Sequence, residues 1–364
     1  MDIDNNVSHE TDGENVVSSL MVKCRNCGAN MVFDANTQSL YCSHCETRIS
    51  FNDQSVGQEI KLTAEYFDSD SNKDEESTVF VCDNCNAKIV LNKNQTSTNC
   101  PFCGTSHVSH SENLKGVKPN AIVPFNFGDI KAIEFAKKWA KKKLYAPRKF
   151  KKSLNAENVK GVYYPCFTFD SYTDSSYYGR IGKTHTRTVG SGKNKRVQTY
   201  VVWRNISGTY YSRFDDVLIS AGEKINQKNI DKLSPFSTNE SKEYQENYLL
   251  GYLAYHYDCG VNESWDKAKA LIDKSLYRQI LSQYNYDRVD YLNVSTKHSN
   301  VTFKYLMLPV YIGNFLFRKK HFNFFINGRT GKVTGKTPVS IFKVLLTIFS
   351  SVGLILLLYF LFSH

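Results

Sequence analysis

Residues 24–45, CRNCGANMVFDANTQSLYCSHC, and residues 82–103, CDNCNAKIVLNKNQTSTNCPFC, share one cysteine spacing. In each stretch, two Cys-x-x-Cys pairs are separated by fourteen residues. Each stretch therefore offers four thiolates, the ligand set that Zn²⁺ takes in closed tetrahedral structural sites. The sequence predicts two zinc ions, the first bound by Cys24, Cys27, Cys42 and Cys45 and the second by Cys82, Cys85, Cys100 and Cys103.

The short Cys-x-x-Cys segments are typical of the knuckles of a zinc ribbon. The second set begins 58 residues after the first, which indicates an internal duplication. His44 lies inside the first ribbon and His107 beside the second, and either could replace a thiolate as a ligand. Because each site already has four cysteines, we interpret both histidines as surface residues.

An even number of cysteines would also permit a disulfide framework in a secreted protein. Residues 1–20 contain five acidic residues and no Lys or Arg, whereas a signal peptide is basic and then apolar. A cytosolic setting keeps thiols reduced. We therefore expect the cysteines to be reduced and metal-bound.

The other end of the chain is strongly apolar. Residues 344–362, VLLTIFSSVGLILLLYFLF, contain no charged residue. As a helix they would extend roughly 28 Å, close to the thickness of the hydrocarbon core of a bilayer. Lys332, Lys336 and Lys343 precede this segment, as the positive-inside rule expects of a cytoplasmic flank. The sequence predicts a tail-anchored, single-pass protein of the cell membrane, with its N-terminal domains in the cytoplasm.

Composition divides the chain into segments. These are a disordered acidic tail at 1–20, zinc ribbon 1 at 21–51, an acidic linker at 52–77, zinc ribbon 2 at 78–110, an α+β domain at 115–337 and a transmembrane helix at 341–362. The linker includes the charged run DSDSNKDEES at 68–77, which extends because its like charges repel one another.

Alternating and helical patterns follow Pro119 and predict the α+β domain. We expect a strand at 120–127, and then a helix from an Asp129 N-cap through Leu144. The expected apolar side of this helix consists of Ile130, Ile133, Ala136, Trp139, Ala140 and Leu144. Residues 162–221 predict a β-meander with turns at GSGKNK (190–195) and ISGT (206–209). A second helix is expected at 262–283, with strands at 301–317 and a hairpin over 321–335 that turns at Asn327-Gly328.

The resulting fold class is multidomain: two small zinc ribbons of four cysteines each, an α+β domain with a mostly antiparallel sheet, and one C-terminal transmembrane helix.

Positive charge is concentrated in two parts of a chain whose net charge is +11. Residues 115–152 contain twelve Lys and Arg against Asp129 and Glu134, and residues 180–204 contain seven and no acid. Three interpretations remain open. The cations could form a solvated face, bind anionic lipid beside a membrane anchor, or bind nucleic acid through its phosphates.

Motifs for catalysis are missing from the sequence. It has no P-loop, no G-x-G-x-x-G, no H-E-x-x-H and no G-x-S-x-G. Cys166 and Cys259, with His256 or His185, invite a Cys–His mechanism, but no third orienting group is identifiable. Asp258 and Glu263 near His256 could form a metal site, but a surface loop of polar residues explains them more simply. We therefore expect a protein that is not an enzyme.

Several segments together carry a resemblance to a known family. They are the two four-cysteine ribbons, AKKWAKKKLYAPRKFK (136–151), GVYYPCFTFD (161–170), YLLGYLAYHYD (248–258) and NGRTGK (327–332). In these segments the chain resembles bacterial membrane-anchored double zinc-ribbon proteins. That family is labelled transcription factor IIB-type or primosomal helicase-like, and some of its members are encoded beside phage-shock-type envelope stress proteins. The resemblance implies a membrane adaptor and carries over only the eight cysteines as functional residues.

Our leading hypothesis is a non-enzymatic membrane adaptor whose ribbons recruit a cytoplasmic protein partner. The alternative is a membrane-associated nucleic-acid-binding protein, and an enzyme with an unfamiliar site comes last. The knuckle residues of both ribbons include one arginine, Arg25, whereas a ribbon that binds phosphate would carry more basic residues. This scarcity favours a protein partner, with anionic membrane lipid as a further candidate.

Overall fold

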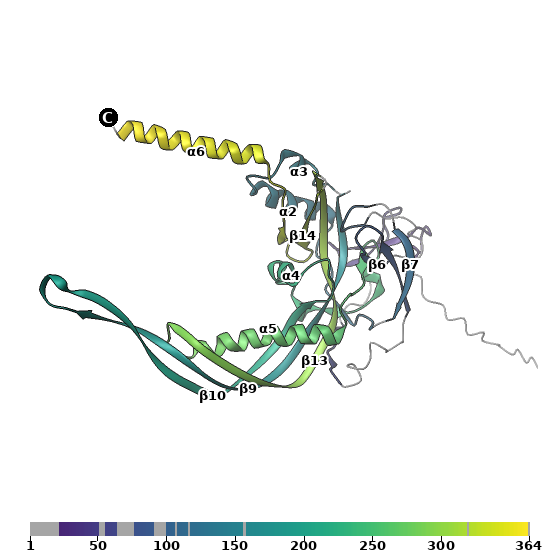
Figure 1. Cartoon of the computed structure of the whole chain (residues 1–364). Helices are drawn as coiled ribbons and strands as arrows, with labels where there is room; N and C mark the ends of the chain where they lie inside the picture. Colours follow the sequence, from purple (N-terminus) through teal and green to yellow (C-terminus); the bar gives the residue numbers. More distant parts are fainter. Residues whose placement is uncertain are drawn as a thin grey trace, which may run out of the picture.

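The computed structural model describes residues 22–50, 55–63, 76–90, 100–105, 108–115, 117–155, 158–318 and 320–362 (Figure 1). The predicted acidic tail, residues 68–75 of the charged run and His107 lie outside these ranges.

The first ribbon is a small antiparallel sheet of β1 (Met31–Asp34), β2 (Ser39–Cys42) and β3 (Arg48–Ile49). Its apolar side chains, such as Phe33 and Leu40, are buried in the same core as the α+β domain. Two backbone carbonyls of that domain also bind the ribbon: the Phe33 amide donates to Leu250 at 2.8 Å, and Gln38 Nε2 donates to Phe125 at 2.7 Å. The ribbon is therefore fixed to the surface of the domain.

The second ribbon belongs to the large sheet of the α+β domain. Its strands β5 (Glu76–Cys82) and β6 (Lys88–Val90) pair with each other, and β5 also pairs with β7 (Val108–Lys115). Strand β6 continues through β12 (Leu253–Tyr255) into β9 (Val159–Val189). The second ribbon thus extends one side of the sheet.

The large sheet has twelve strands among the residues that the structure describes, in the central order β11-β8-β13-β9-β12-β6-β5-β7. The remaining members are β4 (Ile60–Lys61), β8 (Ala121–Ile122), β10 (Arg196–Ser220), β11 (Lys242–Glu243), β13 (Arg288–Phe317), β14 (Lys320–Asn327) and β15 (Val333–Gly335). The β12–β9 and β13–β8 pairs are parallel and the other pairs are antiparallel, which confirms the predicted sheet type.

Strand β4 comes from the predicted acidic linker and pairs with β13 through Lys61 and Ile60. Residues 55–63 are therefore attached to the sheet.

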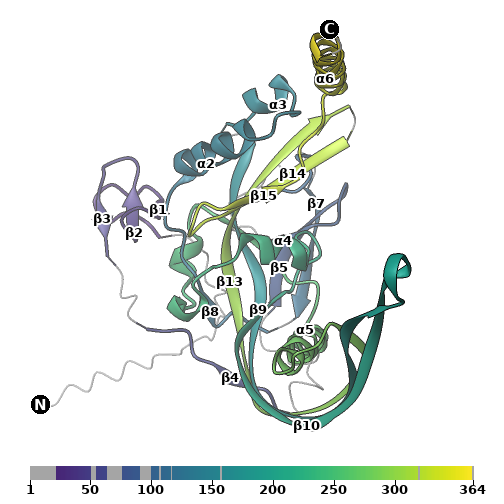
Figure 2. The same ribbon diagram turned by 90° about the vertical axis from the view of Figure 1, so that its left-hand side faces the viewer.

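Three strands continue far beyond the body of the domain (Figures 1 and 2). We call this extension the arm and define it as residues 171–189 of β9, 196–214 of β10 and 288–299 of β13. The predicted turn at 206–209 is wrong, because these residues pair without a break with residues 176–179 of β9. Gly208 lies against the Tyr177 ring instead, where a Cβ atom would meet the Tyr177 hydroxyl at 2.8 Å. The chain turns at the other predicted place, near the short helix Gly192–Asn194.

Helix α5 (Val261–Ser282) lies in the concave side of the arm, as Figure 2 shows. Its Ile280 and Leu281 pack with Tyr177, Ile181 and Ile206 of the arm. This helix was predicted to within one residue at each end. The smaller helices α4 (Gln227–Leu233), Thr238–Glu240 and Glu246–Leu249 connect strands of the body.

Helix α2 (Asp129–Lys141) corrects two details of the prediction. Its N-cap residue is Gly128, and Asp129 is the first helical residue, whose Oδ1 accepts from the Ile130 amide at 2.8 Å. The buried stripe consists of Ala132, Ala136 and Ala140, whereas Ile130 and Leu144 are 75% and 64% exposed. Ile130 lies in the exposed first turn and Leu144 lies beyond the helix end, so neither reaches the sheet.

Helix α3 (Arg148–Lys152) follows α2, and α6 (Ile341–Phe362) projects from the body beside them (Figure 1). No side chain of α6 is buried. By length and composition it could cross a membrane, and it has the bounds predicted for the transmembrane helix.

Candidate metal centres

The four Cys-x-x-Cys turns have one backbone design. In the first, the Cys24 amide donates to the Ala29 carbonyl at 2.8 Å, and the Gly28 amide donates to the Cys24 carbonyl at 2.9 Å. The same two bonds recur in the other three turns, which begin at Cys42, Cys82 and Cys100. Each turn therefore directs both of its sulfur atoms to one side, as a zinc knuckle requires.

The residue after each second cysteine has a left-handed backbone. These residues are Gly28 (φ 72°), Glu46 (φ 61°), Asn86 (φ 56°) and Gly104 (φ 75°). Glycine adopts this conformation freely, and asparagine tolerates it better than most residues. Three of the four knuckles thus carry a residue suited to this backbone, and Glu46 is the exception.

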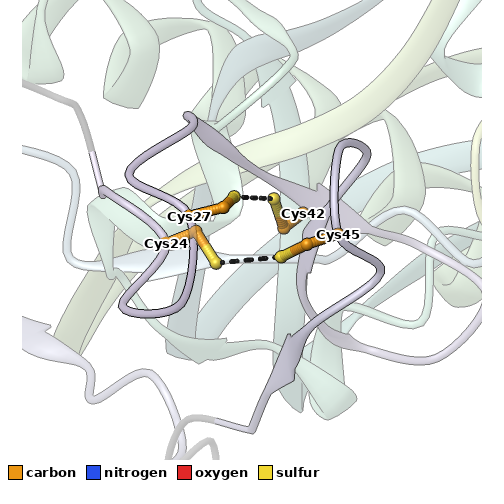
Figure 3. A group of neighbouring side chains, drawn as sticks. All are labelled: Cys24, Cys27, Cys42 and Cys45. Atoms are coloured by element: carbon orange, nitrogen blue, oxygen red, sulfur yellow. Dashed lines mark hydrogen bonds between the residues drawn. The ribbon is translucent and has the colours of Figure 1, made fainter.

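The sulfur atoms of the first ribbon converge, as Figure 3 shows. Cys24 and Cys45 Sγ are 3.4 Å apart, and Cys27 and Cys42 Sγ are 3.5 Å apart. In the second ribbon, the Cys82–Cys103 and Cys85–Cys100 distances are both 3.6 Å.

These distances fit a metal site. Four sulfurs about 2.3 Å from a zinc ion define a tetrahedron with edges of about 3.8 Å, whereas a disulfide bond measures about 2.05 Å. Within each group all four sulfurs lie within 4.8 Å of one another. The prediction of two four-cysteine groups is confirmed, and both groups can bind zinc. Because all four positions are cysteine, neither site leaves a coordination position for substrate.

An Asn–Thr pair supports each site and was missed in the sequence. Asn26 Nδ2 donates to Thr47 Oγ1 at 2.9 Å, and that hydroxyl lies 3.1 Å from Cys45 Sγ. Asn84 and Thr105 repeat the first contact at 3.1 Å, and Thr105 Oγ1 lies 3.4 Å from Cys103 Sγ. Such outer contacts orient metal ligands. Alignment of the two copies would have revealed the pair, since both contain C-x-N-C-x-A and C-x-x-C-x-T.

Backbone amides favour the thiolate form at the first site. The amides of Asn26 and Cys27 lower the pKa of the Cys24 thiol to about 6. Hydrogen bonds from Thr47 also lower the pKa of Cys45. At Cys27 the Ala29 amide also lowers the pKa, but contacts with the other three thiols outweigh it and raise the pKa to about 12. Because only the thiolate binds metal, the backbone and Thr47 contacts favour metal binding by Cys24 and Cys45.

The two sites differ in exposure. At the first site Cys27 and Cys45 are exposed, together with their neighbours Arg25 and His44. His44 therefore lies on the surface, outside the group of four sulfurs.

At the second site Cys82, Cys100 and Cys103 are buried. Here the α+β domain forms a hydrogen bond to each knuckle: Asn314 Nδ2 donates to the Phe102 carbonyl at 2.6 Å, and Lys224 Nζ donates to the Cys85 carbonyl. The second site is part of the domain core.

Within the part of the chain that the structure describes, neither of the two remaining cysteines has a histidine as a hydrogen-bond partner. Cys166 is fully buried in β9, and burial raises its pKa. Cys259 Sγ lies 3.2 Å from Glu263 Oε1 and 3.0 Å from Lys267 Nζ. His256 Nδ1 lies 2.8 Å from the Tyr257 carbonyl oxygen.

A third group, Glu59, Asp170 and Asp216, could hold a metal by geometry. Lys304 is already bound there, because its Nζ lies 2.9 Å from Asp216 Oδ1 and 3.6 Å from Glu59 Oε1. Burial raises the pKa of Asp170 to about 7. We interpret the group as a partly buried ion-pair network.

Comparison with known proteins gives one informative match. No family model matches the chain, and no solved structure matches it. A Bacillus subtilis protein described as uncharacterized protein YdjG is 31% identical over 327 residues, which covers 88% of this chain and 91% of that protein. The similarity therefore spans most of the chain. The chain belongs to the family of this Bacillus subtilis protein.

Proposed function

We propose that the protein is a non-enzymatic membrane adaptor that recruits a cytoplasmic protein partner through its first zinc ribbon. The observation that carries this proposal is the contrast between the two ribbons. In the second, three of the four cysteines and the 101–103 knuckle are buried, and only the 82–85 knuckle exposes side chains, those of Asp83 and Asn84. In the first, both knuckles face solvent through Arg25, Cys27, His44 and Cys45. A rigid, exposed turn held by a closed metal site suits protein recognition, because binding it costs little ordering entropy.

The anchor half of the proposal rests on α6. Its side chains are exposed along its length, which suits a helix surrounded by lipid. We extend the proposal to a tail-anchored topology with the ribbons in the cytoplasm, because lysines precede the helix. On the resemblance to zinc-ribbon proteins encoded beside phage-shock-type proteins, we also include a role in the envelope stress response.

The test separates the knuckle surface from the zinc site. Arg25→Glu with His44→Glu changes the exposed surface and leaves all four thiolates in place. We expect this variant of the full chain to reach the membrane fraction but to lose crosslinks to the partner captured by the wild type. Lys61→Glu with Lys242→Glu provides a charge-reversal control on β4 and β11 of the large sheet. Unchanged capture by the knuckle variant would contradict the proposal.

A specific surface favours the nucleic-acid alternative. Because side chains alternate along strands, Lys183, His185 and Arg187 of β9 share one face of the arm with Arg196 and Arg204 of β10. Tyr200 lies on the same face, and the Arg187 guanidinium is 5.6 Å from the centre of its ring. Cations interleaved with aromatic rings can bind single-stranded nucleic acid.

Salt dependence decides between the two functions. Binding to phosphates releases counterions, so affinity for DNA or RNA would fall steeply as salt increases. We expect the full chain in detergent to bind both only weakly at physiological salt. Sub-micromolar binding that is lost on Arg187→Gln with Arg196→Gln would move the assignment to nucleic acid.

A further inference from the structure

The base of α6 is attached to one corner of the α+β domain. We call this corner, residues 137–152, the basic corner; it comprises the end of α2, the following turn and α3. The Ser340 amide donates to the Tyr145 carbonyl at 2.8 Å, and Lys343 Nζ donates to the Ala146 and Leu144 carbonyls at 2.7 and 3.2 Å. Both views place α3 beside the start of α6 (Figures 1 and 2).

The basic corner contains no acidic residue. Its cations are Lys137, Lys138, Lys141, Lys142, Lys143, Arg148, Lys149, Lys151 and Lys152. Lys141, Lys142, Arg148, Lys149 and Lys152 are exposed, and none of these five forms an ion pair with the residues that the structure describes. Their charges are therefore available to an anionic partner.

Exposed apolar side chains lie between these cations. Leu144 is 64% exposed and Tyr145 is 40% exposed, although both belong to the turn that contacts α6. Phe342, in the first turn of α6, is 75% exposed. Aromatic residues with Lys and Arg at the end of a membrane-spanning helix are typical of the membrane–water interface. The exposure of Leu144, which contradicted the sequence prediction, is explained if this turn faces lipid.

We propose that the basic corner binds the headgroups of anionic phospholipids at the membrane surface where α6 begins. The proposal rests on α6 crossing the membrane, which the proposed function also requires. The hydrogen bonds to Tyr145, Ala146 and Leu144 keep the corner beside the helix entry point, within reach of the headgroups. Arg148 can bind a phosphate through two parallel N–H bonds, while the lysines act as point charges.

Lipid is favoured over nucleic acid at this surface for a geometric reason. A corner held at the base of a membrane helix faces a dense layer of phosphates, and each basic residue near such a surface contributes to attraction. Bound there, the corner and α6 would hold the α+β domain at two points and so restrict its tilt on the membrane. The ribbons would then be presented at a defined height.

The test is photo-crosslinking of the full chain in nanodiscs made of phosphatidylcholine, with or without phosphatidylglycerol. One variant carries the photoreactive residue p-benzoylphenylalanine in place of Tyr145. A second carries it in place of Tyr200, which is 43% exposed, has basic neighbours and lies on the arm. A third carries it in place of Leu346, in α6, and reports whether the helix is inserted.

We expect phosphatidylglycerol adducts at position 145 to exceed the phosphatidylcholine adducts by about tenfold. Lys141→Gln, Lys142→Gln, Lys149→Gln and Lys152→Gln together should remove this preference. The same loss of charge on the arm, from Lys183→Gln, Arg187→Gln, Lys195→Gln and Arg196→Gln, should leave it intact.

Three results would overturn the proposal. The first is an equal or absent lipid yield at position 145 while position 346 reacts with lipid. The second is a phosphatidylglycerol preference at position 200 instead of 145, which would assign lipid binding to the arm. The third is crosslinking of added competitor RNA at position 145 with loss of the lipid adducts. None of these three results bears on partner capture, so each would contradict lipid binding without contradicting the adaptor function. A position 346 that does not react with lipid would contradict insertion of α6, on which both proposals rest.

Discussion

Glu46 occupies the position that Gly28, Asn86 and Gly104 occupy in the other three knuckles. With φ at 61°, it is the one of the four whose side chain is least suited to a left-handed backbone. A residue with a Cβ atom pays about 1–2 kcal/mol for this conformation. Part of the zinc-binding free energy of the first site therefore compensates for this strain.

We predict that Glu46→Gly increases the zinc affinity of the first site by about fivefold, since it removes about 1 kcal/mol of strain. Gly28→Ala is the matched change in the opposite direction. No atom lies within 4 Å of the position its Cβ would take, so its effect comes from the backbone alone. Competition with a chromophoric chelator measures both variants. Equal affinities for Glu46→Gly, Gly28→Ala and the wild type would contradict the strain argument.

Asp170 provides a second test at the residue scale. Burial, together with the neighbouring carboxylates of Asp215 and Glu59, raises its pKa from 3.8 to about 7, while the Asp216 amide and the nearby Lys304 favour its charged form. Between pH 3.8 and about 7, the Asp170 carboxyl is therefore protonated in the folded state and ionised in the unfolded state. Its contribution to stability is complete at low pH and is lost as the pH rises from 3.8 to about 7.

We expect Asp170→Asn, which imitates the protonated carboxyl, to lack this loss. The difference in Tm between Asp170→Asn and the wild type should become more positive between about pH 5 and about pH 8. Thermal unfolding of the full chain in detergent measures it, with Asp290→Asn, an exposed carboxylate paired with Arg180, as the control. A difference that is constant or falls with pH would contradict the assignment.

At the scale of elements, the two ribbons play different parts. The first contacts the domain through one side of a small separate sheet, whereas strand β6 of the second continues through β12 into β9. Loss of the second zinc should therefore disturb the large sheet directly, while loss of the first should disturb it less.

We predict that Cys82→Ser with Cys85→Ser lowers the Tm of the whole α+β domain, because several of the roughly 10–16 kcal/mol that zinc supplies to such a site are lost. Cys24→Ser with Cys27→Ser should unfold the first ribbon and lower the main transition by less, because this ribbon covers part of the shared core but pairs no strand with the large sheet. Circular dichroism and limited proteolysis of the full chain distinguish the two cases. Equal effects of the two variants on the main transition would contradict the different parts assigned to the two ribbons.

Helix α6 provides the second prediction at this scale. Truncation after Ser340 removes an element with no buried side chain, so we expect release from the membrane without a change in the Tm of the α+β domain. Fractionation after carbonate and high-salt washes measures the release, and the full chain is the control. A truncated protein that stays in the washed membranes would contradict a single anchor in α6.

The elements show what the sequence could and could not predict. The four-cysteine groups and α6 follow from local spacing and from an unbroken apolar run, and both were predicted with the correct residues. The length of β9 and β10 was missed because Gly208, read as a turn, packs against Tyr177 of the neighbouring strand. Likewise, the exposure of Leu144 depends on where α2 ends and on the contact with α6, neither of which is encoded in helical periodicity.

At the scale of the whole molecule, the ribbons, arm and membrane helix surround one sheet. Figure 2 shows the first ribbon (β1 to β3) and the tip of the arm on opposite sides of the body, and α6 leaves from a third place. A partner on the first ribbon would therefore not collide with the arm. This arrangement suits a protein that holds a partner at a membrane, and it depends on two properties of the full chain, zinc at both ribbons and insertion of α6.

Zinc analysis of the full chain, purified from the membrane fraction in detergent without added metal, tests both properties at once. We predict about two zinc ions per chain, about one after Cys24→Ser with Cys27→Ser, and the same amount of protein in the membrane fraction in both cases. A zinc content near zero with the eight cysteines oxidised to disulfides, or a full chain found in the soluble fraction, would contradict it.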